Sequence, residues 1–179
     1  MENPLVLYHV TRREYSDGQV VLRRDVWNQF VERIHEEERG WVEERFERLR
    51  PPACPSRYTA IFAFDSLGAC LRFANGEERQ RGTLGAADWK YYVVELMSPT
   101  RHPICLVDFV DKLGVDLDVG RLVREYWRPT REWKRYEYLG SQMQVLDLVA
   151  PPDRELAEQD LTRALLDRDT MLQMQLNRG

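Results

Sequence analysis

The sequence contains none of the short motifs that mark the commonest enzyme mechanisms. It has no GxGxxG, GxxxxGK[ST], GxSxG or HExxH string, so a dinucleotide-binding loop, a P-loop, a nucleophile elbow and a zincin site all lack support. No apolar run approaches the roughly 20 residues that cross a bilayer, and the first residues lack the basic and apolar segments of a signal peptide. We therefore expect a cytoplasmic protein without membrane contact.

Cysteine and histidine are scarce, with three of each. The cysteines form no CxxC pair and are odd in number, and the histidines lie far from them and from one another in sequence. We expect reduced thiols and no metal site. The six residues are Cys54, Cys70, Cys105, His9, His35 and His102.

The composition is that of one ordinary globular unit. The 179 residues are 43% hydrophobic and 31% charged, which separates the chain from the disordered and collagenous classes. The net charge is 26 − 30 = −4, so no overall positive field attracts nucleic acid or anionic lipid, although local basic patches can still exist.

Strands and helices are expected in an irregular order. This order favours an α+β fold over a doubly wound sheet. A polar, glycine-containing loop is expected over residues 75–88. The last predicted strand is read as one long strand or a hairpin, kinked at Gly140-Ser141. The predicted strands are 5–10, 19–22, 58–64, 89–97, 104–109 and 136–149, and the predicted helices are 25–49, 67–73, 119–127 and 153–175.

Two predicted helices carry marked charge or apolar patterns. In the helix over 25–49, which Gly40 can divide, a mixed-sign run that includes Glu43, Glu44 and Glu47 is interpreted as a solvated face. The C-terminal helix is expected to pack on the same domain, giving a 1–150 domain and a 151–179 helix, with partner binding as the alternative. Its expected inward residues are Leu156, Leu161, Ala164, Leu165, Met171 and Leu172.

An ordered series of segments resembles the ADP-ribosyltransferase fold of the His-Tyr-Glu class. Leu7–Thr11 is similar to its first strand, and Ile61–Ser66 with the following helix is similar to its middle strand and helix. Trp89–Leu96 followed by Val107-Asp108 is similar to the next strand and acidic turn, and the segment from Glu137 to Val149 is similar to the closing strand. Within this family, the segments most resemble small bacterial transferases, those similar to rifamycin-modifying enzymes and to toxins that act on DNA or RNA.

The resemblance implies a split mixed or antiparallel β core with flanking helices and NAD as cosubstrate. His9 would donate a hydrogen bond to a ribose hydroxyl, and the backbone of Val10 would hold the nicotinamide carboxamide. Thr11 would support His9 or the ribose. Without the family pattern, His9 would be interpreted as a satisfied histidine at a strand end.

The second residue of the His-Tyr-Glu triad departs from the family pattern, because Phe62 occupies the position where the class usually has tyrosine. A phenylalanine ring can still stack on nicotinamide, and Tyr58 is the alternative. Ser66 would contact the nicotinamide amide, although a helix N-cap explains it equally.

Glu137 is the expected catalytic residue, together with His9. Cleavage of the nicotinamide–ribose bond builds positive charge on the sugar, which a nearby carboxylate stabilises. The alternative is an exposed strand glutamate paired with Arg135 or another neighbour, and Gln142 is the reserve polar candidate.

The segment Arg121–Arg135 interleaves basic and aromatic residues. Such a pattern can follow a nucleic-acid backbone and stack bases, or grip the NAD pyrophosphate. The alternative is inward tryptophans with solvated arginines.

The expected function is NAD-dependent mono-ADP-ribosyl transfer to a protein, nucleic acid or small molecule. A toxin, effector or defence role would suit a small transferase, and a housekeeping role is equally open. Three alternatives remain open. They are NAD hydrolysis, an inactive binding module on the same fold, and a chance match to an unrelated protein.

Overall fold

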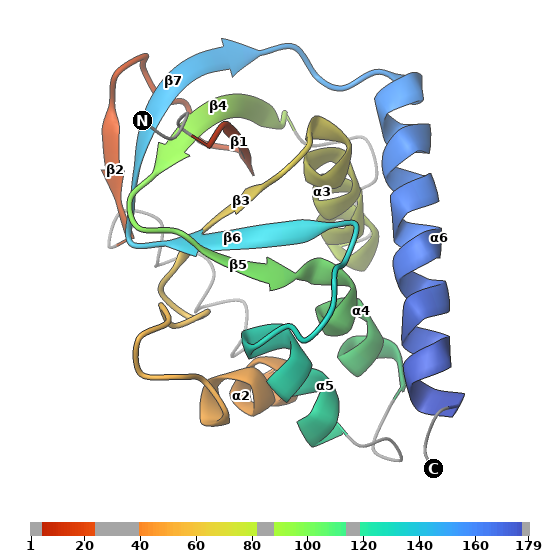
Figure 1. Ribbon diagram of the computed structural model, residues 1–179. Helices are drawn as coiled ribbons and strands as arrows, with labels where there is room; N and C mark the ends of the chain where they lie inside the picture. Colours follow the sequence, from red (N-terminus) through yellow and green to blue (C-terminus); the bar gives the residue numbers. More distant parts are fainter. Residues whose placement is uncertain (1–4, 24–39, 82–87, 114–118, 177–179) are drawn as a thin grey trace.

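The computed structural model describes residues 5–23, 40–81, 88–113 and 119–176 (Figure 1). These segments form an α+β structure, as the element order predicts. The strands are β1 (Leu7–Thr11), β2 (Val20–Leu22), β3 (Ile61–Phe64), β4 (Lys90–Leu96), β5 (Thr100–Pro103), β6 (Tyr136–Gly140) and β7 (Gln142–Val149). The helices are α2 (Gly40–Arg48), α3 (Leu67–Arg81), α4 (Ile104–Leu113), α5 (Val119–Trp127) and α6 (Arg154–Leu176).

The seven strands form one sheet in the order β2-β7-β4-β1-β3-β6-β5, and every neighbouring pair is antiparallel. In Figure 1, α6 stands along one side of the molecule beside α3, and α2 and α5 lie at the lower end below β5. The predicted site strands β1, β3 and β6 are therefore consecutive neighbours in the sheet, between β4 and the edge strand β5.

The strand predicted over 104–109 is wrong, because these residues begin α4. A short apolar run is equally compatible with a buried strand and a buried helix. The strand lies just before it: β5 pairs with β6 over Thr100–Pro103, and Pro103, which has no N–H to continue a ladder, precedes the helix. The loop expected from residue 75 is also wrong as far as Arg81, where α3 ends, and its residues 82–87 lie outside the described part.

The segment 136–149 is neither one strand nor a hairpin. Its first half, β6, pairs with β3 and β5, whereas its second half, β7, pairs with β4 and β2. The break comes at Gly140-Ser141, as predicted. A Cβ on Gly140 would lie 2.8 Å from a methyl carbon of Leu96, so glycine lets the chain approach β4 as it crosses the sheet.

Helix α6 packs on the body of the molecule through a face that differs from the prediction. Met171 is fully buried as expected, but Leu161, Leu165 and Leu172 are about half exposed. The inward face carries carboxylates instead: Asp160 accepts a 3.0 Å bond from Arg135 Nε, and Asp167 accepts the backbone N–H groups of Lys134 and Arg135. Buried charged residues with specific partners, not leucines, therefore set the rotation of this helix.

Candidate functional site

The register of the central strands divides the predicted site residues into two groups. Tyr8 of β1 is directly opposite Phe64 of β3, and Phe64 is directly opposite Glu137 of β6. Opposed residues of an antiparallel pair point to the same side, whereas neighbours along a strand alternate. Glu137 and Phe62 therefore lie on one side of these strands, and His9 lies on the other.

Glu137 is enclosed in a buried ionic cluster, which we define as Glu43, Arg57, Tyr126 and Glu137. Arg57 and Glu137 are each only 4% exposed. Arg57 Nη1 donates hydrogen bonds to Glu137 Oε1 and to the Tyr126 hydroxyl, and this hydroxyl donates to the same Oε1 at 2.6 Å. Arg57 Nε and Nη2 donate to the two carboxylate oxygens of Glu43 at 2.7 and 3.1 Å. One guanidinium thus holds two carboxylates from different elements.

The charges of this cluster follow from burial and pairing. Burial raises the pKa of Glu137, although Arg57 opposes this shift. Burial lowers the pKa of Arg57, but Glu137 and Glu43 outweigh it and the pKa is well above its ordinary value. Burial also raises the pKa of Tyr126 well above its ordinary range.

Sequence reasoning missed Arg57 and misassigned Glu43. Arg57 lies in the loop between α2 and β3, and its partners are 14 and 80 residues away in sequence, so no local spacing could reveal the cluster. Glu43 belongs to the charge run that was interpreted as a solvated helix face, but it is buried. Glu137 pairs with Arg57 and not with Arg135, which binds Asp160.

His9 is buried on the other side of the central strands. Its Nδ1 lies 2.7 Å from the carbonyl oxygen of Phe62. A carbonyl only accepts, so Nδ1 carries the proton, and in the neutral ring Nε2 is an acceptor. Burial lowers the pKa of His9 and favours this neutral form. Nε2 is buried and has no hydrogen-bond partner within the described residues.

The ladder that joins β1 to β3 is short and ends beside this histidine. The β1–β3 ladder consists of the single pair Tyr8↔Phe64, whereas β1 pairs with β4 along its whole length. Val10 is opposite Tyr91 of β4 and has no register partner on β3. The imidazole of His9 binds the Phe62 carbonyl at the place where this ladder ends. We call this place the β1–β3 opening.

The other predicted contacts are dispersed. Thr11 accepts a hydrogen bond from the Arg13 N–H at 3.2 Å. Phe62 is half-buried, and its ring lies 5.1 Å from the Arg57 guanidinium carbon, on the Glu137 side. Tyr58 is half-buried in the loop before β3. Ser66 accepts the N–H of Ala69 at 3.1 Å, the N-cap interaction that was the alternative interpretation.

The basic and aromatic segment Arg121–Arg135 is only partly on the surface. Tyr126, Trp127 and Trp133 are buried, and Trp127 donates to the Phe46 carbonyl at 2.8 Å. The prediction that these rings stack on bases is therefore wrong for this structure, and the alternative of inward tryptophans is correct. The arginines of α5 remain at the surface.

No cluster of three or more metal-ligating side chains occurs among the described residues. None of the described helices has the length and hydrophobicity to cross a bilayer. A scan against protein-family models gives no match to this sequence, and a search of curated proteins finds no relative.

Proposed function

We propose that the chain is an NAD-binding module with an ADP-ribosyltransferase-like split sheet, and that Glu137 does not act in it as a catalytic carboxylate. The β1–β3 opening is the binding place. There the backbone of Val10 lacks a β3 partner, and Nε2 of His9 provides a buried acceptor for a ribose hydroxyl. The resemblance described above supplies the identity of the ligand.

The observation that carries this proposal is the enclosure of Glu137 by Arg57 and Tyr126, on the side of the strands that faces away from His9. A carboxylate stabilises an oxocarbenium-like sugar through its negative charge at short range. Glu137 already faces the Arg57 guanidinium and the Tyr126 hydroxyl, and it lies on the opposite side of the strands from His9. The Arg57 guanidinium offsets much of the negative charge of this carboxylate. Strand β3 would also lie between the carboxylate and a ligand bound to His9.

NAD-dependent ADP-ribosyl transfer is the second candidate, and one feature favours it. Both hydrogen bonds that Glu137 accepts in the cluster end on Oε1, so Oε2 is not used by Arg57 or Tyr126. Transfer through Glu137 would require this oxygen to reach the bound sugar. Hydrolysis of NAD would have the same requirement, with water as the acceptor.

The test compares binding with cleavage. NAD is titrated calorimetrically into the wild type, His9→Gln, Glu137→Gln and His102→Gln, and nicotinamide release is followed with and without cell lysate. We expect binding without release and little change for Glu137→Gln. His9→Gln should lose roughly five- to tenfold in affinity, because one amide cannot replace both the Nδ1 donor and the Nε2 acceptor of the imidazole and one hydrogen bond is lost. His102→Gln is the matched control, because it alters a buried histidine outside the opening.

The other outcomes separate the alternatives. Nicotinamide release that disappears in Glu137→Gln and increases with lysate would replace the proposal by the transferase, and release independent of lysate would indicate hydrolysis. Absence of NAD binding by the folded wild type would overturn every NAD-based function.

A further inference from the structure

The solvent-facing side of α5 is almost entirely arginine. Six of its nine residues are buried: Val119, Leu122, Val123, Glu125, Tyr126 and Trp127. The remaining residues are Gly120, Arg121 and Arg124, and the exposed Arg128 follows directly. These arginines are three and four residues apart, so they form a row along one helix face.

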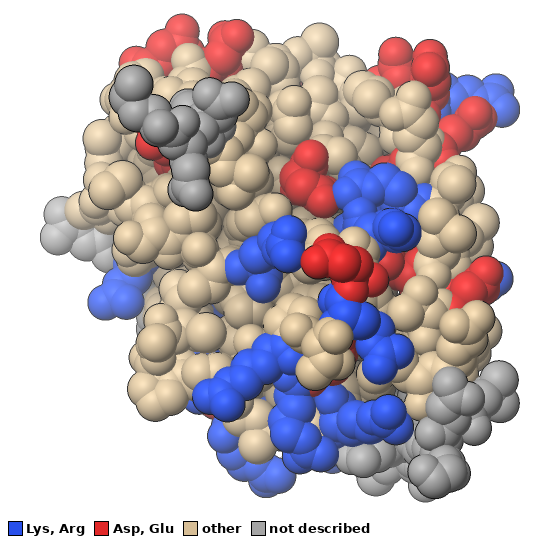
Figure 2. All heavy atoms as spheres, in the orientation of Figure 1, with Lys and Arg blue, Asp and Glu red and all other residues tan. Residues whose placement is uncertain are grey.

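Helix α2 adds cations to the same surface. The exposed Arg48 lies two residues after Phe46, whose carbonyl accepts the indole N–H of Trp127. Figure 2 shows Lys and Arg side chains gathered at the lower end of the molecule, over α5 and α2. We define the basic patch as Arg48, Arg121, Arg124, Arg128 and Arg131.

Three arginines of the basic patch lack an acidic partner within the described part of the chain. Glu125, the only carboxylate in α5, is buried and accepts hydrogen bonds from Thr130 and Trp133, and Arg131 is the patch residue near it, at 3.8 Å. Within the described residues, the guanidinium groups of Arg48, Arg124 and Arg128 form no ion pair. In a chain of net charge −4, such a local excess of one sign is not a consequence of composition.

We propose that the basic patch binds the phosphate backbone of a nucleic acid. A row of guanidinium groups, each able to contact phosphate through two N–H donors, fits a polymer whose charges repeat at regular intervals. Trp127 and Trp133 are buried and cannot stack on bases, so recognition by the arginines is through phosphate and independent of sequence. A membrane fits less well, because the outward positions of α5 hold only glycine and arginine and no apolar side chain that could insert.

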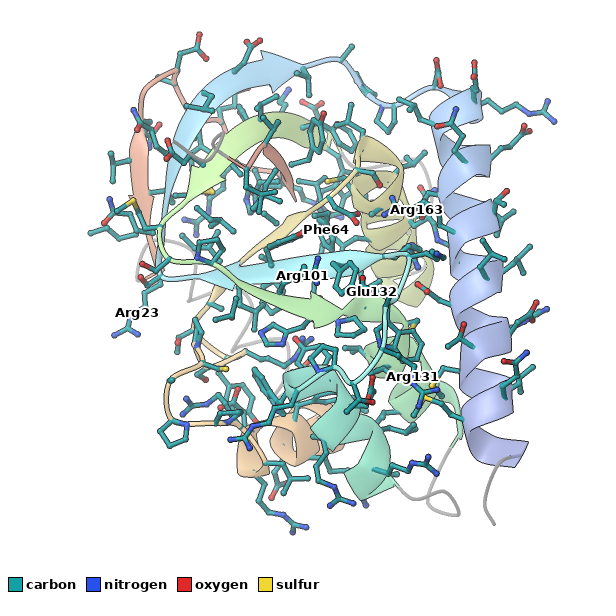
Figure 3. All side chains as sticks on the ribbon, viewed as in Figure 1. Arg23, Phe64, Arg101, Arg131, Glu132 and Arg163 are labelled. Atoms are coloured by element: carbon teal, nitrogen blue, oxygen red, sulfur yellow. The ribbon has the colours of Figure 1, made fainter. Side chains whose placement is uncertain are left out.

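This inference does not depend on the NAD proposal, because the patch and the β1–β3 opening share no residue. The test measures fluorescence anisotropy of a labelled single-stranded RNA and of a labelled DNA duplex over a range of salt concentrations. Arg124→Ala/Arg128→Ala is compared with Arg23→Ala/Arg154→Ala, which makes the same charge change at exposed arginines. Arg154 is the first residue of α6. Arg23 directly follows β2, on a different side of the molecule from α5 (Figure 3).

We expect the wild type to bind at low salt and to weaken steeply as salt rises. Arg124→Ala/Arg128→Ala should weaken binding by about tenfold, roughly threefold per lost phosphate contact, and should reduce the slope of log K against log salt by about 1.4 for the RNA. The control pair should bind like the wild type. Equal losses in both pairs, or failure of the folded wild type to bind either polymer, would overturn the proposal. Binding to phosphatidylserine vesicles without binding to either polymer would assign the surface to membranes instead.

Discussion

Replacing Arg57 by methionine should be among the most destabilising single changes in this protein. The substitution keeps most of the side-chain volume but removes the only guanidinium between Glu43 and Glu137. Both carboxylates then remain in a buried site, and the Tyr126 hydroxyl is the one cluster donor left for Glu137. Burial already raises the pKa of Glu137 in the presence of Arg57, so the penalty of its charge is large.

The expected magnitude follows from measured buried pairs. Breaking such a pair by removing one partner costs about 3–5 kcal/mol, which in a domain of this size lowers Tm by roughly 6–20 °C. Urea denaturation gives the free energy of unfolding, and thermal denaturation gives Tm. Arg154→Met is the matched control. It breaks an i,i+4 pair with Glu158 on the exposed surface of α6, so its cost should be a few tenths of a kcal/mol.

The pH dependence distinguishes unpaired charge from lost packing. Without Arg57, the pKa of Glu137 should rise further in the folded chain. A carboxyl whose pKa is higher in the folded than in the unfolded state binds more protons when folded, so the stability of the variant increases as the pH falls through the folded pKa. Arg57→Met should therefore recover part of its loss on acidification, and adding Glu137→Gln should recover part of it at neutral pH. A cost below about 1 kcal/mol, or a cost independent of pH and of Glu137, would refute the electrostatic account.

Two further predictions concern other elements. Gly68→Ala should lower the free energy of unfolding by about 1–3 kcal/mol, because the new Cβ would lie 2.5 Å from the Leu156 carbonyl oxygen and push α3 and α6 apart. In the same helix, a Cβ on Gly76 meets nothing within 4 Å, so Gly76→Ala should leave the stability unchanged or raise it by up to about 1 kcal/mol. Chemical denaturation of both variants measures these changes, and equal effects would contradict the prediction. Burial lowers the pKa of His102 from 6.5 to about 4, so the unfolded chain binds more protons between these values and stability should fall as the pH drops from 6.5 to 4. His102→Gln should flatten this part of the profile in a urea series at several pH values, and an unchanged slope would show that other groups cause it.

The sequence predicted the elements with strong local patterns. Strands β1 and β4 alternate or concentrate apolar and aromatic residues, and α5 carries a clear apolar face, so each was placed within a residue or two. Local patterns did not decide how the halves of segment 136–149 pair, because strand pairing joins residues far apart in sequence. They also could not separate helix from strand in the short run that begins α4.

The buried face of α6 is a second feature that local sequence patterns did not predict. Leucine periodicity predicted that Leu161, Leu165 and Leu172 point inward, but these residues are about half exposed. The helix is oriented by Asp160, 1% exposed and bound to Arg135 Nε, and by Arg163, which reaches from α6 to Asp65 at the end of β3 at 2.6 Å (Figure 3). Ion pairs with partners in other elements leave no periodic signal in sequence, and they outweigh a weak apolar pattern.

Partners from distant parts of the sequence also explain the positions of the predicted site residues, and they change which of these residues indicates a binding site. The family resemblance indicates a catalytic role for Glu137, but its hydrogen bonds with Arg57 and Tyr126 already explain its position in the core, so no ligand is needed to account for it. His9 is explained only in part: the Phe62 carbonyl satisfies Nδ1, and nothing described satisfies Nε2. A buried polar atom without a partner carries a cost that a ligand or water can remove. The unmet hydrogen bond of His9, rather than the carboxylate of Glu137, therefore marks where binding should be sought.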